Sequence, residues 1–201
     1  MKKIAISLFY IIKFNSVEAS SFHETFDNPQ SIKNWISGSF IKGQNPQWDI
    51  EKNGNNGILN QKSYATYAFF VNPSIKSKNG TLYVKFNIIS GKEDPEAGLV
   101  WRFQDSQNYL YIRTNTLEKN LIFYRMHQGK KEIVKQAPIL IKNDEWNTLK
   151  VNFYNENIQV FYNSKEILNL KDDLNLLPGA VGLWTTADSR VLFDDLNFEE
   201  P

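Results

Sequence analysis

The sequence predicts an all-β fold in which antiparallel strands pack as a sandwich, and three observations support this prediction. Short runs rich in β-branched and aromatic residues recur along the chain. Gly, Asn, Asp and Pro separate these runs, and no stretch has sustained helical periodicity. The hydrophobic content of 41% is enough to bury a substantial core. We therefore expect one domain, from residue 20 to residue 201.

The first 19 residues have the features of a signal peptide. A short basic region, Lys2 and Lys3, precedes the apolar run Ile4–Ile12, and small residues end at Ala19. We expect cleavage after Ala19 and a secreted or periplasmic mature protein. A membrane anchor would need about 20 apolar residues, far more than this run supplies. An N-terminal core strand would leave the two lysines unexplained.

Before the first clear strand, the pattern is weak. Pro29–Trp35 has room for one helical turn at most, and Asn45–Asn60, rich in Gly and Asn, reads as a loop or a loop with weak strands. Ten strands are predicted after it, at Tyr64–Phe70, Leu82–Ile89, Gly98–Phe103, Tyr109–Thr114, Leu121–Met126, Thr148–Tyr154, Ile158–Tyr162, Ile167–Leu170, Val181–Thr185 and Val191–Phe198.

Alternation and turn chemistry justify these strands. In "WNTLKVNFY", Leu149, Val151 and Phe153 lie on one face and the polar residues between them on the other. In "VFYNSKEIL", a hairpin is expected to turn at residues 163–165, because Asn tolerates the positive φ of a tight turn.

Composition excludes several classes of function. Without its first 19 residues the chain has a formal charge of about −1, and it has no basic run with interleaved aromatics, so nucleic acid is not an expected partner. The chain has no cysteine, which excludes disulfides, Cys-based zinc sites and a thiol nucleophile. Its two histidines, His23 and His127, lie far apart and do not suggest a triad or a zinc site.

Two arginines, Arg102 and Arg113, fall inside a predicted hairpin of aromatic-rich strands. A buried guanidinium without a partner costs several kcal/mol, so each arginine must meet water or a partner. Alternation places Arg113 on one face with Tyr109 and Tyr111, and Arg102 on the face opposite Leu99, Trp101 and Phe103.

How these faces match across the hairpin depends on register. One register stacks Trp101 on Tyr111 and leaves Arg102 among aliphatic residues. The other pairs Trp101 with Leu110 in the core and places Arg102 beside Tyr109 on a polar, aromatic face. We favour the second register, because it spares Arg102 from burial.

Sugar hydrolysis needs two carboxylates facing each other across about 5–9 Å. The candidates are Glu93, Asp94, Glu96, Asp105, Glu118 and Asp188. The first three lie in "GKEDPEAG", which reads as a solvated turn. Glu118 is positioned to pair with an arginine, and such a pair is more often structural or a ligand clamp than a catalytic dyad, because the arginine lowers the pKa of the carboxyl group.

Sugar binding does not require the two opposed carboxylates that sugar hydrolysis needs. Tyr109 and Tyr124 offer rings that can stack on a sugar's C–H face, and Arg102, Arg113 and Asn115 offer donors to hydroxyl groups. The plainer interpretation is a solvated sheet surface, and the pattern alone does not decide between them.

Carboxylates also gather at the two ends of the predicted domain. Glu24 and Asp27 begin it, and Asp194 and Asp195 close it. If the terminal strands are neighbours, these four residues form a weak candidate for a structural calcium site, with solvated acidic residues as the plainer interpretation. No other cofactor is expected.

"AGLVWRFQDSQNYLYIRTNTLEKNLIFYRMHQGKKEIV", with "DEWNTLKVNF", "IQVFYNSKEIL" and "GAVGLWTTADSRVLFDDLNF", resembles the concanavalin A-like lectin/glucanase superfamily. Within it, the chain is most similar to exported bacterial domains described as 3-keto-disaccharide hydrolases, with a laminin-G-like topology. The resemblance implies a two-sheet antiparallel jelly roll that binds carbohydrate on its concave sheet. The Glu-x-Asp-x-x-Glu strand of laminarinase-type members is absent.

Three hypotheses follow. The first is an exported carbohydrate-binding domain whose ligand-binding residues are Arg102, Tyr109, Arg113, Asn115, Glu118 and Tyr124. The second is a glycoside hydrolase-like enzyme of the same fold, with Glu118 or Asp188 as weak catalytic candidates. The third is a cell-envelope interaction module without a sugar site. The expected partner is a carbohydrate or glycoconjugate, and a stable membrane span is not expected.

Overall fold

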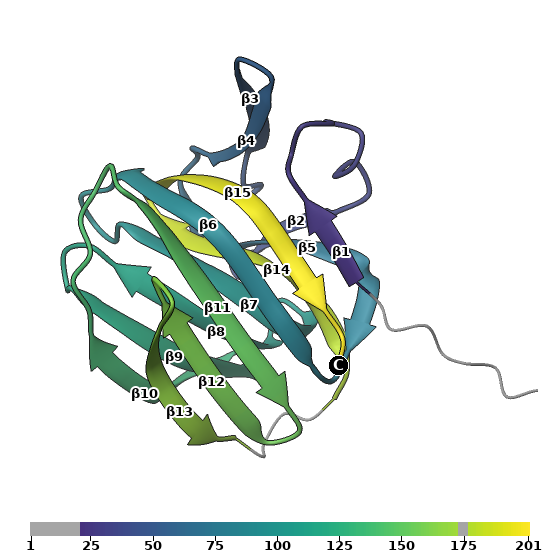
Figure 1. The fold of residues 1–201 in the computed structure, drawn as a ribbon, viewed down its shortest axis with the longest axis vertical. Helices are drawn as coiled ribbons and strands as arrows, with labels where there is room; N and C mark the ends of the chain where they lie inside the picture. The colour runs from purple at the N-terminus through teal and green to yellow at the C-terminus, as the bar shows by residue number, and fades with distance from the viewer. Residues whose placement is uncertain (1–20, 173–176) are drawn as a thin grey trace, which may run out of the picture.

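The computed structural model describes residues 21–172 and 177–201, and these form two antiparallel sheets packed face to face (Figure 1). Within these ranges every regular element is a strand, which confirms the predicted all-β sandwich. No helix in the described part of the chain is long and apolar enough to cross a membrane. The predicted signal peptide, residues 1–19, lies outside the described residues.

The eight-stranded sheet contains both ends of the described chain. Its strand order is β13-β12-β11-β6-β15-β4-β3, and β1 also pairs with β15. Its strands are β1 (Ser21–Glu24), β3 (Trp48–Asn53), β4 (Asn56–Gln61), β6 (Gly80–Ser90), β11 (Trp146–Tyr154), β12 (Asn157–Tyr162), β13 (Lys165–Lys171) and β15 (Arg190–Glu199).

The seven-stranded sheet packs against it with the order β10-β9-β8-β7-β14-β5-β2. Its strands are β2 (Ile36–Ser39), β5 (Ala65–Ser77), β7 (Glu96–Asp105), β8 (Asn108–Asn115), β9 (Asn120–His127), β10 (Lys130–Pro138) and β14 (Gly179–Ala187). The long central hairpins β7–β8 and β8–β9 therefore lie in one sheet, side by side (Figure 1).

All ten predicted strands are found, in β5 to β9 and β11 to β15. The four strands before β5 were missed or judged weak; β3 and β4 lie in the segment taken as a loop with weak strands. β10 was also missed, because "KKEIVKQAP" carries three lysines and lies mostly exposed. It forms one edge of the seven-stranded sheet, where lysines discourage pairing with another chain.

The predicted hairpin in "VFYNSKEIL" is confirmed. Tyr162 pairs with Lys165 across a two-residue turn, and both turn residues have positive φ, 46° at Asn163 and 65° at Ser164. Positive φ at both positions is the pattern of a type I′ turn, whose twist matches that of the flanking strands.

Two apolar clusters result, one on each face of the seven-stranded sheet. The core between the sheets includes Trp101, which stacks on Phe123 and Phe153 with ring centroids 5.3 and 6.0 Å apart. The second cluster lies on the outer face of the seven-stranded sheet and is rich in aromatic residues. Its members are Phe69, Val71, Val100, Phe103, Tyr109, Tyr111, Ile122, Tyr124, Met126, Ala180 and Trp184.

Candidate functional site

From Glu96 to Trp101, strand β7 pairs with β8 in the register favoured from the sequence. Trp101 pairs with Leu110 and lies in the core between the sheets, as predicted. The register then shifts before Asp105, and Arg102 has a φ of +49°, which marks a β-bulge. Because the bulge inserts an extra residue, Phe103 belongs to the outer cluster instead of sharing the face of Trp101.

The bulge also turns Arg102 away from the outer face. Its Nε donates to the carbonyl oxygen of Lys78 at 3.0 Å and its Nη2 to that of Asn155 at 2.5 Å. Its guanidinium lies 5.7 Å from the ring of Phe153, and the side chain is fully buried. The prediction that Arg102 escapes burial and joins the face of Arg113 is therefore wrong. Arg102 connects the β5–β6 and β11–β12 turns instead of contacting a ligand.

Arg113 does lie on the outer face, at the centre of a polar network. Its Nε is 2.9 Å from Glu96 Oε1, and its Nη2 is 2.6 Å from Glu118 Oε2 and 3.4 Å from the hydroxyl of Tyr124. Its Nη1 donates to Asn120 Oδ1. The predicted pairing of Glu118 with an arginine is confirmed. Nη1 and Nη2 both donate hydrogen bonds, whereas Nε contacts Glu96 at ion-pair distance without hydrogen-bond geometry.

A pocket of about 140 Å³ opens beside this network. It is lined by residues from β5, β7 to β10 and β14 and from two turns, namely Tyr67, Asp94, Glu96, Tyr111, Arg113, Glu118, Tyr124, Lys131, Trp184 and Thr186. We call it the Arg113 pocket. Eight of the ten lining residues are charged or are tyrosines, so the pocket offers hydrogen-bond partners on several sides.

Stacked rings form one wall of the pocket. Tyr111 lies between Tyr124 and Trp184, with ring centroids 4.9 and 4.5 Å away, and Tyr67 stacks on Trp184 at 6.0 Å. The ammonium of Lys131 lies 4.8 Å from the ring of Tyr67 and 5.1 Å from that of Tyr124. Flat rings beside polar groups suit a ligand that has apolar C–H faces and a polar rim.

The three carboxyl groups of the pocket differ in acidity. Burial raises the pKa of Glu96 from 4.5 to about 7, although Arg113 and Asn115 oppose the shift. Burial, together with the charge of Glu118, raises the pKa of Asp94. The hydrogen bond from Arg113 lowers the pKa of Glu118. Near neutral pH, Glu96 is therefore the group that exchanges a proton most readily.

Glu96 should make folding stability depend on pH. Between its unfolded pKa of 4.5 and its folded pKa of about 7, the folded state binds the proton more tightly, so stability falls as pH rises through this window. We expect wild type to be more stable at about pH 5 than at about pH 8, with a contribution from Glu96 on the order of 3 kcal/mol. In Glu96→Gln this dependence should largely disappear from urea denaturation curves. Equal pH slopes in the two proteins would contradict this assignment.

Other sequence-predicted residues lie nearby but do not line the pocket. Tyr109 is fully buried, with Phe103 and Tyr111 as ring neighbours at 5.6 and 5.5 Å. Asn115, also fully buried, donates to Glu96 Oε1 at 3.0 Å and accepts hydrogen bonds from the backbone of Leu117 and Glu118. Tyr109 thus supports the aromatic wall, and Asn115 positions two carboxylates.

Asp188 holds the loop that carries Asp94. Its carboxylate accepts hydrogen bonds from the backbone N–H groups of Lys92 at 2.7 Å and Glu93 at 3.0 Å. Ser189, next to it, donates to the carbonyl oxygen of Asp94. These contacts give Asp188 a positioning role beside the pocket instead of the catalytic role considered from sequence.

The four carboxylates proposed for calcium hold the chain termini in place. Glu24 accepts the N–H of Phe26, and Asp27 accepts that of Gly57, both at 2.7 Å. Asp194 accepts a hydrogen bond from Asn56, and Asp195 pairs with Lys85 and His23. In residues 21–172 and 177–201 no three His, Cys, Asp or Glu side chains gather closely enough to hold a metal ion. Calcium binding here stays a prediction.

Sequence reasoning missed much of the pocket. The sequence predicts a solvated turn around Pro95, yet Glu96 begins β7 and is 5% exposed. Its alternation with Gly98 and Val100 was the available signal for the outer face. Tyr67 and Lys131 come from strands distant in sequence, and no local pattern indicated that they meet Arg113.

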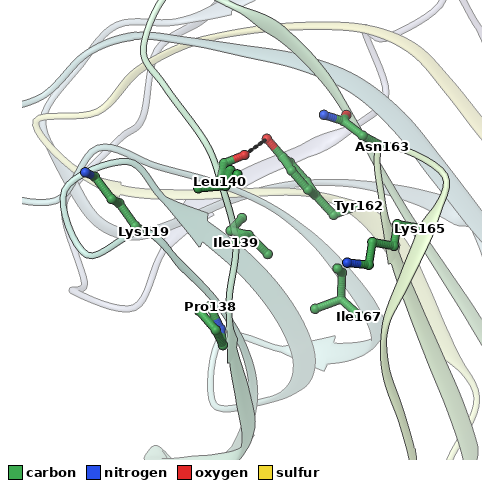
Figure 2. Close-up of a pocket in the computed structure, with 8 residues that line it drawn as sticks. All are labelled: Lys119, Pro138, Ile139, Leu140, Tyr162, Asn163, Lys165 and Ile167. Carbon is green, nitrogen blue, oxygen red and sulfur yellow. Dashed lines mark hydrogen bonds between the residues drawn. The ribbon is translucent and has the colours of Figure 1, made fainter.

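A larger pocket, of about 600 Å³, lies at the edge of the sandwich (Figure 2). Its lining is mainly apolar, with Pro138, Ile139 and Leu140 facing Tyr162 and Ile167, and Lys119, Asn163 and Lys165 around them. The hydroxyl of Tyr162 donates to the Leu140 carbonyl at 3.1 Å. Because it lacks converging polar side chains, this pocket is a weaker candidate for a sugar than the Arg113 pocket.

Comparison with known proteins gives similar structures without similar sequences. No family model matches the sequence, and no curated protein matches it. Among solved structures, the carbohydrate-binding module CBM66 from Bacillus subtilis has a TM-score of 0.71 and 15% identity, over 84% of this chain and 97% of that one. A prokaryotic β-1,3-1,4-glucanase (lichenase) from a mouse hindgut metagenome has a TM-score of 0.64 and 15% identity, over 90% and 100%.

A galectin, LEC-6 from Caenorhabditis elegans, also matches, with a TM-score of 0.51 and 11% identity over 79% of this chain and 98% of that one. The chain has the concanavalin A-like jelly-roll fold. This likeness confirms the jelly-roll sandwich predicted from the sequence. At such identities it establishes the fold, and the closer resemblance to 3-keto-disaccharide hydrolase-like domains stays a prediction.

Proposed function

We propose that this protein binds carbohydrate and that a sugar unit enters the Arg113 pocket. The observation that carries the proposal is the pairing of a stacked aromatic wall, Tyr111 and Trp184, with carboxylates held by Arg113. A sugar ring presents an apolar C–H face to such rings and hydroxyl donors to such oxygens. Sugar-binding and sugar-cleaving proteins among the structural neighbours support the same reading.

The size of the pocket limits how much of a glycan it accepts. Its volume of about 140 Å³ matches on the order of five water molecules at ~30 Å³ each. That is room for one sugar ring, so we propose recognition of a single terminal or branching unit instead of an extended chain. We propose that the outer face of the seven-stranded sheet, on which the pocket opens, is the sugar-binding face that the family resemblance implies.

A glycan array, followed by calorimetry on each hit, tests this function. We expect Glu118→Gln to weaken binding about tenfold or more, because a charge-assisted hydrogen bond contributes about 1.5–3 kcal/mol. Glu199→Gln, at the end of β15 in the other sheet, is the matched control and should bind as wild type does. Absence of any glycan hit, or equal affinities for all three proteins, would contradict the proposal.

A second candidate function is glycoside hydrolysis, because two carboxyl groups of one pocket have pKa values shifted in opposite directions. Glu96, with its pKa raised to about 7, suits a general acid, and Glu118, with its pKa lowered, suits a base or nucleophile. In this case Glu96→Gln should abolish cleavage of bound oligosaccharides while preserving their binding. Wild type that binds but does not cleave its ligand would exclude the enzyme and keep the binding module.

The proposal includes export from the cytoplasm, which rests on the basic and apolar N-terminal residues 1–19. Expression of the whole chain, fractionation of the cells and mass spectrometry of the mature N-terminus test it. We expect a chain that begins at Ser20 outside the cytoplasm. An uncleaved cytoplasmic chain would contradict it.

A further inference from the structure

The Arg113 pocket contains more carboxyl groups than basic groups. Asp94, Glu96 and Glu118 face two cations, Arg113 and Lys131. The guanidinium of Arg113 is largely taken up by protein groups, because Nη1 and Nη2 donate to Asn120, Glu118 and Tyr124 and the buried Nε lies 2.9 Å from Glu96 Oε1. A ligand in the pocket therefore finds carboxylate oxygens more available for hydrogen bonding than the guanidinium N–H groups.

Two of these oxygen-bearing groups have unused acceptor positions. The half-buried carboxylate of Asp94 has no side-chain hydrogen bond or ion pair among residues 21–172 and 177–201. Glu96 is more than nine-tenths buried, and within the described chain its contacts all go to Oε1, from Arg113 and Asn115, which leaves Oε2 for the pocket. Leaving carboxylate oxygens unpaired at partial burial costs free energy, which a ligand donor would recover.

Lys131 does not cancel this excess of acceptors. Its ammonium lies over the rings of Tyr67 and Tyr124, where the ring faces attract it. The arrangement thus has a cation over two rings of the aromatic wall, whereas Asp94 and Glu96 Oε2 keep acceptor positions without a hydrogen bond from the described chain.

We propose that the Arg113 pocket selects sugars that carry a free amine, with the ammonium bound by Asp94 and Glu96. An ammonium has three hydrogen-bond donors and no acceptor, so it complements unpaired carboxylate oxygens better than a hydroxyl does. A uronic acid places a second carboxylate against them and is rejected by like-charge repulsion. This inference rests on the proposed function, since it assigns the class of sugar to the same pocket.

Matched ligand series test this selectivity. Glucosamine, N-acetylglucosamine and glucuronate each differ from glucose at one carbon, and the corresponding galactose derivatives differ from galactose in the same way. Calorimetry on the full protein, at a pH where the amine is protonated, should show the amino sugar binding about tenfold or more tighter than the neutral sugar. The uronate should bind weakest, and raising the salt concentration should narrow the differences.

Asp94→Asn provides the matched variant, because the amide keeps the shape of the side chain and removes its charge. We expect the ratio of amino-sugar affinity to neutral-sugar affinity to fall toward one in this variant, whereas Glu199→Gln, in the other sheet, should keep the wild-type ratio. If neutral and amino sugars bind wild type equally, or if Asp94→Asn keeps the preference, the selectivity inference is wrong and sugar binding stands. If no sugar in these series or on the array binds, the proposed function fails as well.

Discussion

Replacing Arg113 with alanine should lower the free energy of unfolding by about 3–5 kcal/mol and abolish sugar binding. Arg113 is 3% exposed and holds Glu96, which is 5% exposed, at 2.9 Å. Without the guanidinium, the largely buried carboxylate of Glu96 loses its cation partner. Urea denaturation of both proteins measures the loss of stability, and calorimetry measures the loss of binding.

A double variant tests whether this loss of stability comes from the broken ion pair or from lost packing. In Arg113→Ala with Glu96→Gln, the neutral amide no longer needs a cation, so part of the stability should return. Acid should have the same effect on the single variant, since Glu96 accepts a proton below its raised pKa of about 7. A loss of stability that is equal at low and high pH, and in the double variant, would show that the ion pair is not its origin.

Replacing Arg125 with leucine should destabilise the protein by a similar amount, about 3–5 kcal/mol. Arg125 of β9 contacts the carboxylate of Asp172, which follows β13, and the two side chains are 7% and 0% exposed. This buried pair joins the seven-stranded sheet to the eight-stranded sheet near their edges. Removing the arginine leaves the Asp172 carboxylate without this cation partner, and denaturation in urea should show the loss.

The double variant Arg125→Leu with Asp172→Leu distinguishes a charge penalty from a packing defect. Apolar side chains in place of a whole buried ion pair are often neutral or stabilising, so the double variant should be more stable than Arg125→Leu alone. The exposed pair Lys142–Glu145, 3.3 Å apart, is the control, and Lys142→Ala should leave the unfolding midpoint nearly unchanged. Additive losses in the double variant would contradict the proposed role of the pair.

The ten predicted strands show what local pattern can predict. Alternation defines which side chains of a strand share a face, and it correctly grouped Arg113 with Tyr109 and Tyr111. Turn chemistry correctly placed the hairpin at Asn163 and Ser164. Each of these signals involves residues only a few positions apart in the chain, so a single sequence is enough to detect it.

The wrong prediction for Arg102 shows what a local sequence pattern does not determine. A β-bulge inserts one residue and reverses every face after it, and nothing in "WRFQDSQNY" marks the bulge at Arg102 instead of at a neighbouring residue. The partners that settle it, the carbonyl groups of Lys78 and Asn155, come from turns far away in the sequence. Register at a bulge is decided by such distant contacts.

The sequence by itself determined an all-β sandwich, its central strands, the polar, aromatic strand face that carries Arg113, and Glu118 as a partner for one of the two arginines. Only the tertiary structure decided that Glu96, Lys131 and Tyr67 join them in one pocket and that Arg102 does not. The physical reason is that alternation orders side chains within a strand, whereas a site is assembled by the pairing of strands that are distant in sequence.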